Sequence, residues 1–405
     1  MKTNWQTKKL GDVCEIELGK TPYRGDKSFW DGEKKSKNVW LSIADLLKGQ
    51  GKIVSDSKEY ISDKGAKISK IVKEGTLLVS FKLTLGRLAF AGKDLYTNEA
   101  IASLEIKNEK GLSKEFLYYF LTFFDWNKAT EGNVKVKGRT LNKSKLKQIK
   151  IPLPPLATQK AIIKILDQTF ESISKSKENA EKNLKNSKEL FESYLEEIFS
   201  NPKEDWEEKK LRDACEFIRG PFGSSLKKSF FKEKGYAVYE QRHAIYNSFD
   251  NIRYFIDEKK FDEMKRFELF PNDLIMSCSG TMGKIAIAPF NIQKGIINQA
   301  LLKLSTSKKL LNVYLKLWME STDFQRKLRE FSLGAAIQNV ASVKILKDIK
   351  IRLPPISEQT LIVSKLNSLS KEVKKLETIY KQKIKDLEEL KKSMLQKAFN
   401  GELND

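Results

Sequence analysis

The sequence of 405 residues predicts a mixed α/β or α+β protein, built from two homologous globular domains that are each followed by one long helix. A strand, a proline pair and a helix start are written twice, as IKIPLPPLATQKAII and IKIRLPPISEQTLIV. Short β-like runs before each proline pair give way to heptad-spaced apolar residues after it, and the excess positive charge lies before the prolines. We therefore expect globular domains at 1–155 and 200–355 and long helices at 156–199 and 356–405.

The repeat is not confined to the proline pairs. The pattern W-x-x-K-K-L-x-D-x-C-E begins at Trp5 and again at Trp206. Between these and the prolines, GTLLVSFKLTLGRLAFAG resembles NDLIMSCSGTMGKIAIAP. The matched positions there and just downstream are Ser80 with Ser277, Gly86 with Gly283, and Asn98 with Asn298. Ordered matches at offsets of 197 to 201 predict an internal duplication.

Each proline pair predicts the end of a strand and the start of a helix. Proline pushes the residue before it out of the helical region, and it suits the first position of a helix. The helices should therefore begin after Pro155 and Pro355. Ser357 and Thr158 are candidate N-caps, although neither has the Glu or Gln three residues later that completes a capping box.

Both helices have the alternating three- and four-residue spacing of a coiled-coil seam. A helix of about 43 residues at 1.5 Å per residue is roughly 65 Å long. Packing of each helix on its own globule is the alternative, but two seamed helices of equal length are better explained by packing on each other. The expected seam is Leu166, Phe170, Ile173, Ala180, Leu184, Phe191, Tyr194 and Ile198 in the first helix, and Leu366, Leu369, Val373, Leu376, Tyr380, Leu387, Leu390 and Met394 in the second.

The net charge of +22 is concentrated in the globules. Residues 1–155 contain 30 basic and 18 acidic side chains, and residues 200–355 contain 28 and 19. The helices are close to neutral, with 7 basic and 8 acidic residues in 156–199 and 10 and 8 in 356–405. A general lysine bias would have charged the helices as well. The distribution therefore favours an anionic partner for the globules, with nucleic acid ahead of a membrane surface.

The globules differ from one another between the repeated segments. YRGDKSFWDGEKKSKNVW has no counterpart in the second half, and GPFGSSLKKSFFKEKGYAVYEQRHAIY has none in the first. Two related scaffolds with different surfaces suit two different targets. For DNA this predicts a bipartite, non-palindromic site, because the symmetry of a site mirrors the symmetry of the protein.

The sequence writes Leu-Pro-Pro twice at the head of a long helix, followed by Gln159 in the first copy and by Glu358-Gln359 in the second. With this motif and the order globule, helix, globule, helix, the chain resembles the specificity subunit of type I restriction-modification enzymes. The resemblance covers nearly the whole chain and includes the glycine-centred turns before Arg87 and Lys284. The first copy departs from the pattern in having Thr158 where the second has Glu358.

The resemblance implies that the globules are target recognition domains, each of which reads one half of a split DNA sequence. The helices would pack antiparallel and fix the spacer between the half-sites. Two methyltransferase subunits would dock on the chain and use S-adenosylmethionine to methylate an adenine in each half-site. Restriction subunits, which use ATP and Mg²⁺, are an optional addition. The chain itself would be noncatalytic and would bind no cofactor.

Missing motifs agree with a noncatalytic chain. There is no Gly-x-x-x-x-Gly-Lys-Ser/Thr phosphate loop and no Asn- or Asp-Pro-Pro-Tyr/Phe motif of the kind that adenine methyltransferases carry. The single histidine, His243, is expected to be an ordinary surface or core residue, and the cysteines Cys14, Cys215 and Cys278 are expected to be buried free thiols. An N-terminus without an apolar stretch, and no apolar run of about eighteen residues, predict a cytoplasmic protein.

Candidate DNA contacts come from the basic stretches, the glycine turns and the divergent segments. Lysines suit phosphates, and Arg or Gln suits guanine or adenine bidentately, while solvated loops and structural salt bridges remain the alternatives. Expected phosphate contacts are Lys135, Lys137, Arg139, Lys143, Lys227 and Lys228. Arg87 and Lys284 are expected to contact DNA from equivalent turns. Candidate base readers are Arg24, Arg219, Gln241, Arg242 and Gln338.

Two other classes of function stay open at this point. One is an enzyme with an unrecognised nuclease or methyltransferase site, which would modify DNA as an isolated chain. The other is a noncatalytic coiled-coil scaffold whose basic globules bind RNA or acidic proteins. Each would have to explain the duplication separately.

Overall fold

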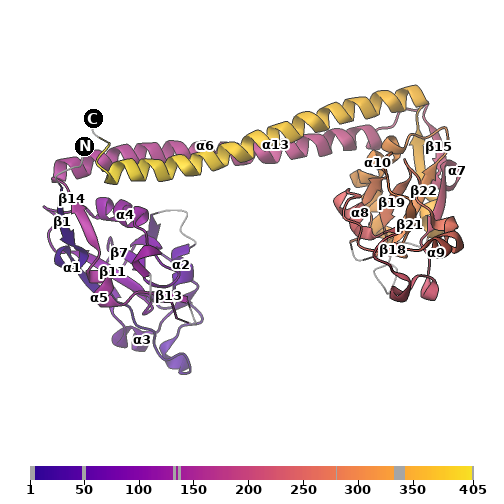
Figure 1. Cartoon of the computed structure of the whole chain (residues 1–405). Coiled ribbons are helices and arrows are strands. Elements are labelled where there is room, and N and C mark those ends of the chain that lie inside the picture. The colour runs from indigo at the N-terminus through magenta and orange to yellow at the C-terminus, as the bar shows by residue number, and fades with distance from the viewer. Residues whose placement is uncertain are drawn as a thin grey trace. The chain divides into compact units, whose positions relative to one another are not determined.

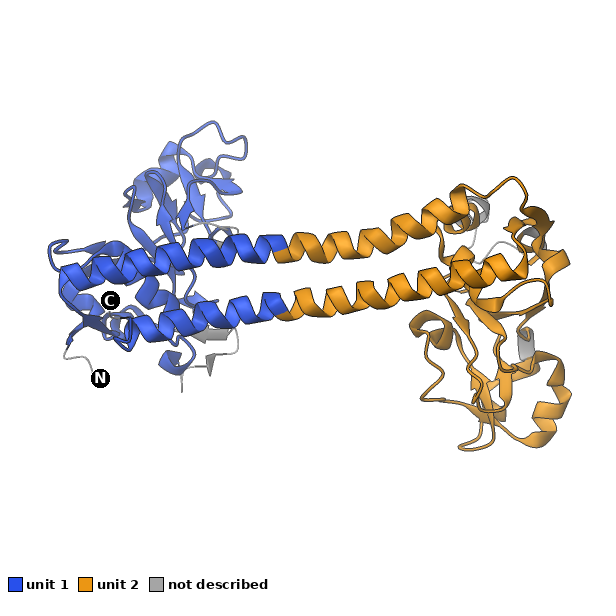
Figure 2. Cartoon of the chain, turned by 90° about the horizontal axis from the view of Figure 1, so that it is seen from above, with its two compact units in different colours: residues 1–179, 383–405 blue, residues 180–382 orange. Residues whose placement is uncertain are grey.

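The computed structural model describes residues 5–47, 52–130, 134–135, 138–279, 281–332 and 343–403, and it divides into two compact units (Figures 1 and 2). The first unit holds residues 1–179 and 383–405, and the second holds residues 180–382. Each unit contains one globular domain together with a part of each long helix. The predicted mixed α/β class, with two similar domains and two long helices, is confirmed.

A largely antiparallel sheet forms the centre of each domain. In the first, Ile101 lies opposite Ser80, and in the second Leu301 lies opposite Ser277, so the two sheets share their register as well as their strand order. The first sheet has the order β2 (Cys14–Leu18), β11 (Ile101–Ile106), β7 (Leu77–Ser80), β9 (Leu88–Ala91) and β4 (Ile53–Val54). The second has the order β16 (Cys215–Arg219), β22 (Leu301–Thr306), β19 (Leu274–Ser277) and β20 (Ile285–Ile287).

A smaller sheet accompanies each central sheet. In the first domain it contains β5 (Glu59–Tyr60), β3 (Val39–Leu41), β10 (Leu95–Thr97) and β6 (Ile71–Val72), and in the second it contains β18 (Phe255–Ile256), β17 (Tyr236–Tyr239) and β21 (Gly295–Ile297). β3 runs parallel to β10, and β17 runs parallel to β21. The first domain also has the sheet β12 (Val134–Lys135), β13 (Gly138–Thr140) and β8 (Lys82–Leu83).

In each domain one helix packs between the central sheet and the long helices, in one apolar cluster with both. The side chains of Phe116, Leu117 and Phe120 on α4 (Lys114–Phe123) are buried in one cluster with the central strands. Its counterpart in the second domain is α10 (Asn312–Glu320). The shorter helices are α1 (Leu10–Val13), α2 (Ile43–Leu47), α3 (Asp63–Ile68) and α5 (Lys143–Lys147) in the first domain, and α7 (Leu211–Ala214), α8 (Gln241–Tyr246), α9 (Glu258–Glu263), α11 (Thr322–Ser332) and α12 (Val343–Asp348) in the second.

The repeated glutamine explains why the sequence after each proline pair is written twice. Gln159 is fully buried; its Oε1 accepts from the backbone N–H of Ser113 at 2.9 Å, and its Nε2 donates to Gly111 O and Pro154 O, each at 2.9 Å. Gln359 makes the same set at the same 2.9 Å distances, with Leu311 N, Lys309 O and Pro354 O. Each glutamine thus ties the start of a long helix to the segment that precedes α4 or α10.

The long helices are α6 (Leu156–Ser200) and α13 (Ile356–Phe399), and each follows a strand of a short antiparallel pair. Because both helices begin directly after the prolines, Thr158 and Ser357 lie inside the first turn, and their expected role as N-caps is wrong. The two antiparallel strand pairs are β1 (Gln6–Lys9) with β14 (Lys150–Leu153), and β15 (Glu207–Lys210) with β23 (Lys350–Leu353). No helix in the described part of the chain is both long enough and apolar enough to cross a membrane.

In each unit a segment of α6 lies beside a segment of α13 that runs in the opposite direction (Figure 2). In the first unit, Lys177 Nζ donates to Glu388 at 2.7 Å, and the ammonium group of Lys391 lies 5.0 Å from the ring centre of Phe170. In the second unit, Leu195 and Leu366 are buried in one cluster. Mutual packing of the helices, rather than packing on their own globules alone, therefore describes both units.

The seam follows the expected spacing with one correction. Leu166, Ile173, Ala180, Leu366 and Val373 are buried, and Phe170, Leu184, Phe191, Tyr194, Ile198, Leu369, Leu376, Tyr380, Leu387 and Met394 are half-buried. Leu390 is 45% exposed, and assigning it to the seam is wrong. Leu387 and Met394 keep their predicted places after Tyr380, and the half-buried Ile384 and the buried Leu395 lie beside them.

Candidate nucleic-acid interface

In the first domain, the connections that follow several strands meet at one edge of the central sheet. β11 is antiparallel to both β2 and β7, so the ends of β2 and β7 lie beside the start of β11. Backbone hydrogen bonds join these connections: Gly19 N donates to Ile101 O at 3.2 Å, Phe81 N to Ala100 O at 3.1 Å, and Asn98 N to Leu41 O at 3.0 Å. We call the surface formed by residues 19–24, 42–47, 81–87 and 98–100 the first strand-end surface.

The second domain repeats this arrangement. Gly220 N donates to Leu301 O at 3.0 Å, Cys278 N to Ala300 O at 2.9 Å, and Asn298 N to Tyr239 O at 2.9 Å. The described residues of 220–228, 240–247, 278–284 and 298–300 form the second strand-end surface. A Cβ on Gly220 would lie 1.8 Å from Asn298 O, and one on Gly19 would lie 2.2 Å from Thr97 O. Only glycine lets the chain leave the first strand this close to its neighbour.

The matched serines and glycines of the sequence build the same turn twice. Ser80 Oγ donates to Thr84 O at 2.6 Å and accepts from the backbone N–H of Arg87 at 3.0 Å. Ser277 Oγ makes the equivalent bonds to Thr281 O and from Lys284 N, also at 2.6 and 3.0 Å. Gly86 and Gly283 have φ values of +73° and +72°, a conformation that favours glycine. The turns therefore present Arg87 and Lys284 at equivalent places.

These two cations have different environments. Lys284 is exposed, and among the described residues none pairs with its ammonium group. Arg87 is half-buried, its Nη1 is shielded from solvent without a hydrogen-bond partner in the described part of the chain, and burial lowers its pKa. A shielded N–H donor without a partner is costly, so an anionic group that arrives at this turn would satisfy Nη1 of Arg87.

Arg24 is held by a carboxylate and two indole rings. Its Nη1 and Nη2 donate to the two carboxylate oxygens of Glu59 at 2.6 and 3.1 Å. The guanidinium carbon lies 4.6 Å from the ring centre of Trp30 and 5.1 Å from that of Trp40. The hydrogen bond to Glu59 raises the pKa of Arg24. The side chain is still 57% exposed, so its remaining N–H donors face solvent.

Three candidate base readers of the second domain, Arg219, Gln241 and Arg242, lie on or beside the second strand-end surface. Arg219 ends β16 and lies against the thiol of Cys278. Burial raises the pKa of this thiol to about 11, and the charge of Arg219 opposes the shift. Gln241 begins α8, and its Oε1 is buried with no hydrogen-bond partner in the described part of the chain. Arg242 Nη1 donates to Asn251 O at 3.4 Å. Lys227 and Lys228 are exposed, just after the 3₁₀ turn Gly223–Leu226.

The basic stretch near the end of the first domain is only partly described. β13 pairs with β8, which lies inside the Ser80 turn, so the backbone of Lys135 and Arg139 extends the first strand-end surface. Leu141 N donates to Phe81 O at 3.0 Å, which places the half-buried Lys143 close to the same turn. The side chains of Lys135 and Arg139, and Lys137 and Gln338 entirely, lie outside the described residues.

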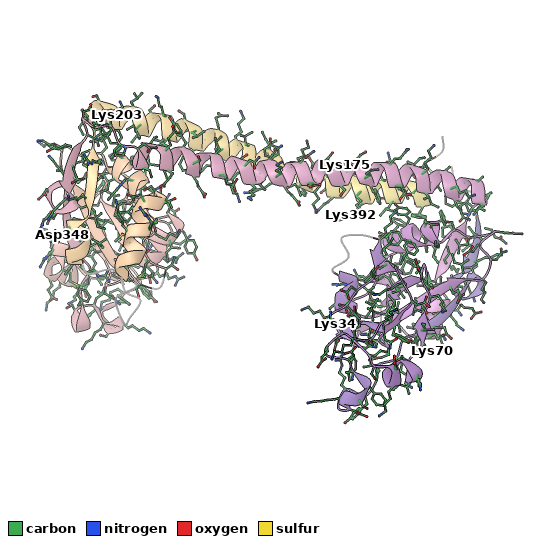
Figure 3. The ribbon with its side chains drawn as sticks, turned by 180° about the vertical axis from the view of Figure 1, so that it is seen from behind. Lys34, Lys70, Lys175, Lys203, Asp348 and Lys392 are labelled. Carbon is green, nitrogen blue, oxygen red and sulfur yellow. The ribbon has the colours of Figure 1, made fainter. Side chains whose placement is uncertain are left out.

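Other cations have structural partners in the first domain. Figure 3 labels Lys34 and Lys70 there; Lys34 Nζ donates to Ser57 O at 2.6 Å, and Lys70 Nζ to Glu17 at 3.0 Å. Both lysines are thus tied to their own domain. Positive charge in the sequence therefore overstates the number of cations that are free for a partner.

Lys20, Lys82, Tyr23 and Phe222 were not predicted from the sequence, although all lie on or beside the strand-end surfaces. Burial would raise the pKa of Glu99, but the Thr21 hydroxyl, Lys82 and Arg24 together hold it below its usual range. The positive charge of Lys82, which belongs to the first strand-end surface, therefore acts on Glu99. A sequence signal for the two aromatic residues does exist: glycine, proline and an aromatic residue follow one another in this order after both β2 and β16. In the first copy, Lys20 and Thr21 are inserted after Gly19.

The histidine and the cysteines have structural environments. His243 is 1% exposed, burial lowers its pKa, and its Nδ1 accepts from the backbone N–H of Glu240 at 2.9 Å. Cys14, Cys215 and Cys278 are buried free thiols, as predicted. Burial raises the pKa of both Cys14 and Cys215 to about 12, which leaves them protonated and unreactive at neutral pH.

Comparison with known proteins identifies the repeated domain. A family model described as the type I restriction modification DNA specificity domain matches residues 2–185 and again residues 203–386. The putative type I restriction enzyme MjaX specificity subunit of Methanocaldococcus jannaschii is 25% identical over an alignment of 424 positions, which covers 99% of this chain and 94% of that protein. The type I restriction enzyme EcoBI specificity subunit of Escherichia coli is 24% identical over 331 residues, covering 76% and 69%.

Solved structures agree on the fold. A structure from work on complex assembly and conformational transition of the type I R-M system superposes with a TM-score of 0.77 at 19% identity, covering 98% of both chains. The HsdS subunit from Thermoanaerobacter tengcongensis gives a TM-score of 0.62 at 19% identity, covering 98% of this chain and 97% of that one. With its two matched domains, their shared register and their paired long helices, this chain belongs to the noncatalytic specificity subunits of type I restriction-modification systems.

Proposed function

We propose that this chain selects the DNA sequence on which a type I restriction-modification complex acts, each domain reading one half of a bipartite, asymmetric site through its strand-end surface. The observation that carries the proposal is the pair of strand-end surfaces, with the same turns and backbone hydrogen bonds but different side chains. Equivalent scaffolds with different reading groups are what an asymmetric split site requires.

Phosphate contacts and base contacts would come from different residues. Lys227, Lys228 and Lys284 are exposed, and together with Lys143 they suit phosphate oxygens. Lys135, Lys137 and Arg139 are proposed for the same role in the first domain. Arg24, Arg219, Gln241, Arg242 and Gln338 are the proposed base readers, because guanidinium and amide groups pair bidentately with guanine and adenine. Arg87 would meet a phosphate at the Ser80 turn.

The antiparallel long helices would set the spacer between the half-sites and seat two methyltransferase subunits. Those subunits would bind S-adenosylmethionine and methylate an adenine in each half-site. Restriction subunits, when present, would supply ATP- and Mg²⁺-dependent cleavage. The chain itself would hold none of these cofactors and would act in the cytoplasm. The internal duplication supports this scheme, since one polypeptide can then offer equivalent positions to two identical partners.

The test is single-molecule mapping of methylated adenines in the genome of the source cell, with the gene intact and with it deleted. The proposal predicts a split motif that disappears on deletion, and the map would report both half-sites and the spacer. An unchanged map would be followed by reconstitution of the chain with its methyltransferase subunits. If that complex also fails to methylate a split duplex, and the chain prefers RNA, the proposal is overturned in favour of an RNA-binding scaffold.

A further inference from the structure

Both strand-end surfaces expose a large aromatic side chain directly after a proline. Tyr23 is 74% exposed and Phe222 is 66% exposed. They follow Pro22 and Pro221, in the connections that leave β2 and β16. An aromatic ring that stays in water gains nothing for the stability of its own domain. The same exposure at the same place in both domains is therefore better explained by a role in binding than by packing.

The backbone around each ring is held in place. Tyr23 O accepts from Asp26 N at 3.2 Å and from the indole N–H of Trp30 at 3.3 Å, and a Cβ on the neighbouring Gly25 would lie 2.7 Å from the Tyr23 ring. Phe222 directly precedes the 3₁₀ turn Gly223–Leu226. Proline before each ring further limits the backbone. A ring on a restrained backbone loses less entropy on binding than one on a free loop.

One of the two rings lies against an arginine that is a candidate for DNA contact: the guanidinium carbon of Arg219 lies 5.7 Å from the ring centre of Phe222. Arg24 follows Tyr23 in the sequence, but its guanidinium lies over the rings of Trp30 and Trp40. An exposed ring beside a cation suits the face of a nucleobase flanked by phosphate better than it suits a protein core.

We propose that Tyr23 and Phe222 are stacking wedges, each of which inserts its ring against a base at a distorted step of its own half-site. The proposal rests on the proposed function. Methyltransferases must take the target adenine out of the helix, which leaves a base face without a stacking partner. Apolar side chains that insert at such steps offset part of the cost of unstacking. Tyr23 serves the half-site read by the first domain, and Phe222 serves the other.

The test uses the chain in complex with its methyltransferase subunits and a duplex of the mapped split sequence. Methylation is measured on the unmodified duplex. For the fluorescence readout, a second duplex carries 2-aminopurine in place of the target adenine of one half-site at a time, since 2-aminopurine lacks the amino group that is methylated and its fluorescence rises when it leaves the stack. The variants are Tyr23→Ala, Phe222→Ala and the conservative Tyr23→Phe. The matched control is Phe290→Ala: Phe290 is 84% exposed, but it lies beyond β20, at the opposite edge of the sheet from the second strand-end surface.

Loss of one stacked ring should slow methylation of the matching half-site by roughly tenfold and lower its 2-aminopurine signal. Tyr23→Phe and Phe290→Ala should leave both readouts unchanged. The wedge is refuted if the wild-type complex methylates the duplex and both alanine variants match it in rate and fluorescence. It is also refuted if Phe290→Ala falls as far as they do, or if each alanine variant slows both half-sites equally. A wild-type complex that methylates no split duplex would instead refute the proposed function.

Discussion

Replacing Gln359 by alanine should destabilise the second unit strongly. The side chain is fully buried and accepts from Leu311 N while donating to Lys309 O and Pro354 O. Each such neutral hydrogen bond contributes about 1 kcal/mol net, and a buried backbone group left without a partner costs about 1–3 kcal/mol. With the lost packing of the side chain, the expected decrease in the free energy of unfolding is about 3–5 kcal/mol.

The assay is urea unfolding of the purified full chain, monitored by circular dichroism and tryptophan fluorescence. Gln159→Ala should produce a decrease of similar size in the first unit, since its hydrogen bonds have the same partners in kind and the same 2.9 Å distances. Gln168→Ala is the matched control, because Gln168 lies exposed on α6 and should cost little. A further variant, Gln359→Met, keeps the volume of the side chain but none of its hydrogen bonds.

The reasoning fails if Gln359→Ala and Gln359→Met both unfold at the same urea concentration as Gln168→Ala. The hydrogen bonds would then contribute nothing that water could not replace. If Gln359→Met is as stable as the wild type while Gln359→Ala is not, the glutamine acts through its volume alone. Either result would mean that hydrogen bonding by the buried glutamine is not the reason for the repeated Leu-Pro-Pro and glutamine pattern.

Three further outcomes are expected. Burial would raise the pKa of Asp167, but hydrogen bonds from Lys52 and Tyr119 hold that pKa below its usual range, so they stabilise the first unit above the unfolded pKa of Asp167. This stabilisation disappears as the pH falls through the lower folded pKa. Asp167→Asn should therefore remove the acid-dependent part of the stability of the first unit, and an unchanged pH profile would contradict this reasoning. Replacing both Lys227 and Lys228 by alanine should weaken binding of the complex to all DNA sequences alike. The slope of log K against log salt should fall in magnitude by about 1 for each phosphate that is no longer neutralised. Weaker binding to one sequence alone would indicate base reading instead. Removing seven residues from the middle of both α6 and α13 shortens each helix by about 10 Å, which is about three base-pair steps of DNA. Methylation mapping should then find the same half-sites with a shorter spacer. Altered half-sites with an unchanged spacer would refute the proposal that the helices set the spacer.

Much of the architecture could be predicted because the signals are periodic or repeated. Duplicated segments at near-constant offsets predict two related domains without any knowledge of their sheets, and heptad spacing predicts the paired helices. The limits appear at single residues. Leu390 fits the spacing but is 45% exposed, while Leu387 and Met394 on either side of it keep their predicted half-buried places. Thr158 has the chemistry of an N-cap but lies inside a helix that begins at Leu156.

The candidate interface was predictable only as a set of residue types. Arg87 and Lys284 could be matched from the glycine turns, and the structure gives both turns the same serine hydrogen bonds. Charge alone did not separate Arg24, whose guanidinium is paired with Glu59, from Lys284, which is exposed. Glu59 lies 35 residues from Arg24, so no local pattern could have indicated their contact.

The sequence by itself determined that the chain is duplicated, that each half holds a basic globule and a long seamed helix, and that the halves differ where they would read a target. These properties follow from repetition, periodicity and composition, which can be read along one dimension. Only the tertiary structure decided which connections meet at the strand-end surfaces, which cations are already neutralised, and that Tyr23 and Phe222 remain in water. Those outcomes depend on contacts between segments far apart in the chain, and their energies are set by burial and distance, which no local pattern encodes.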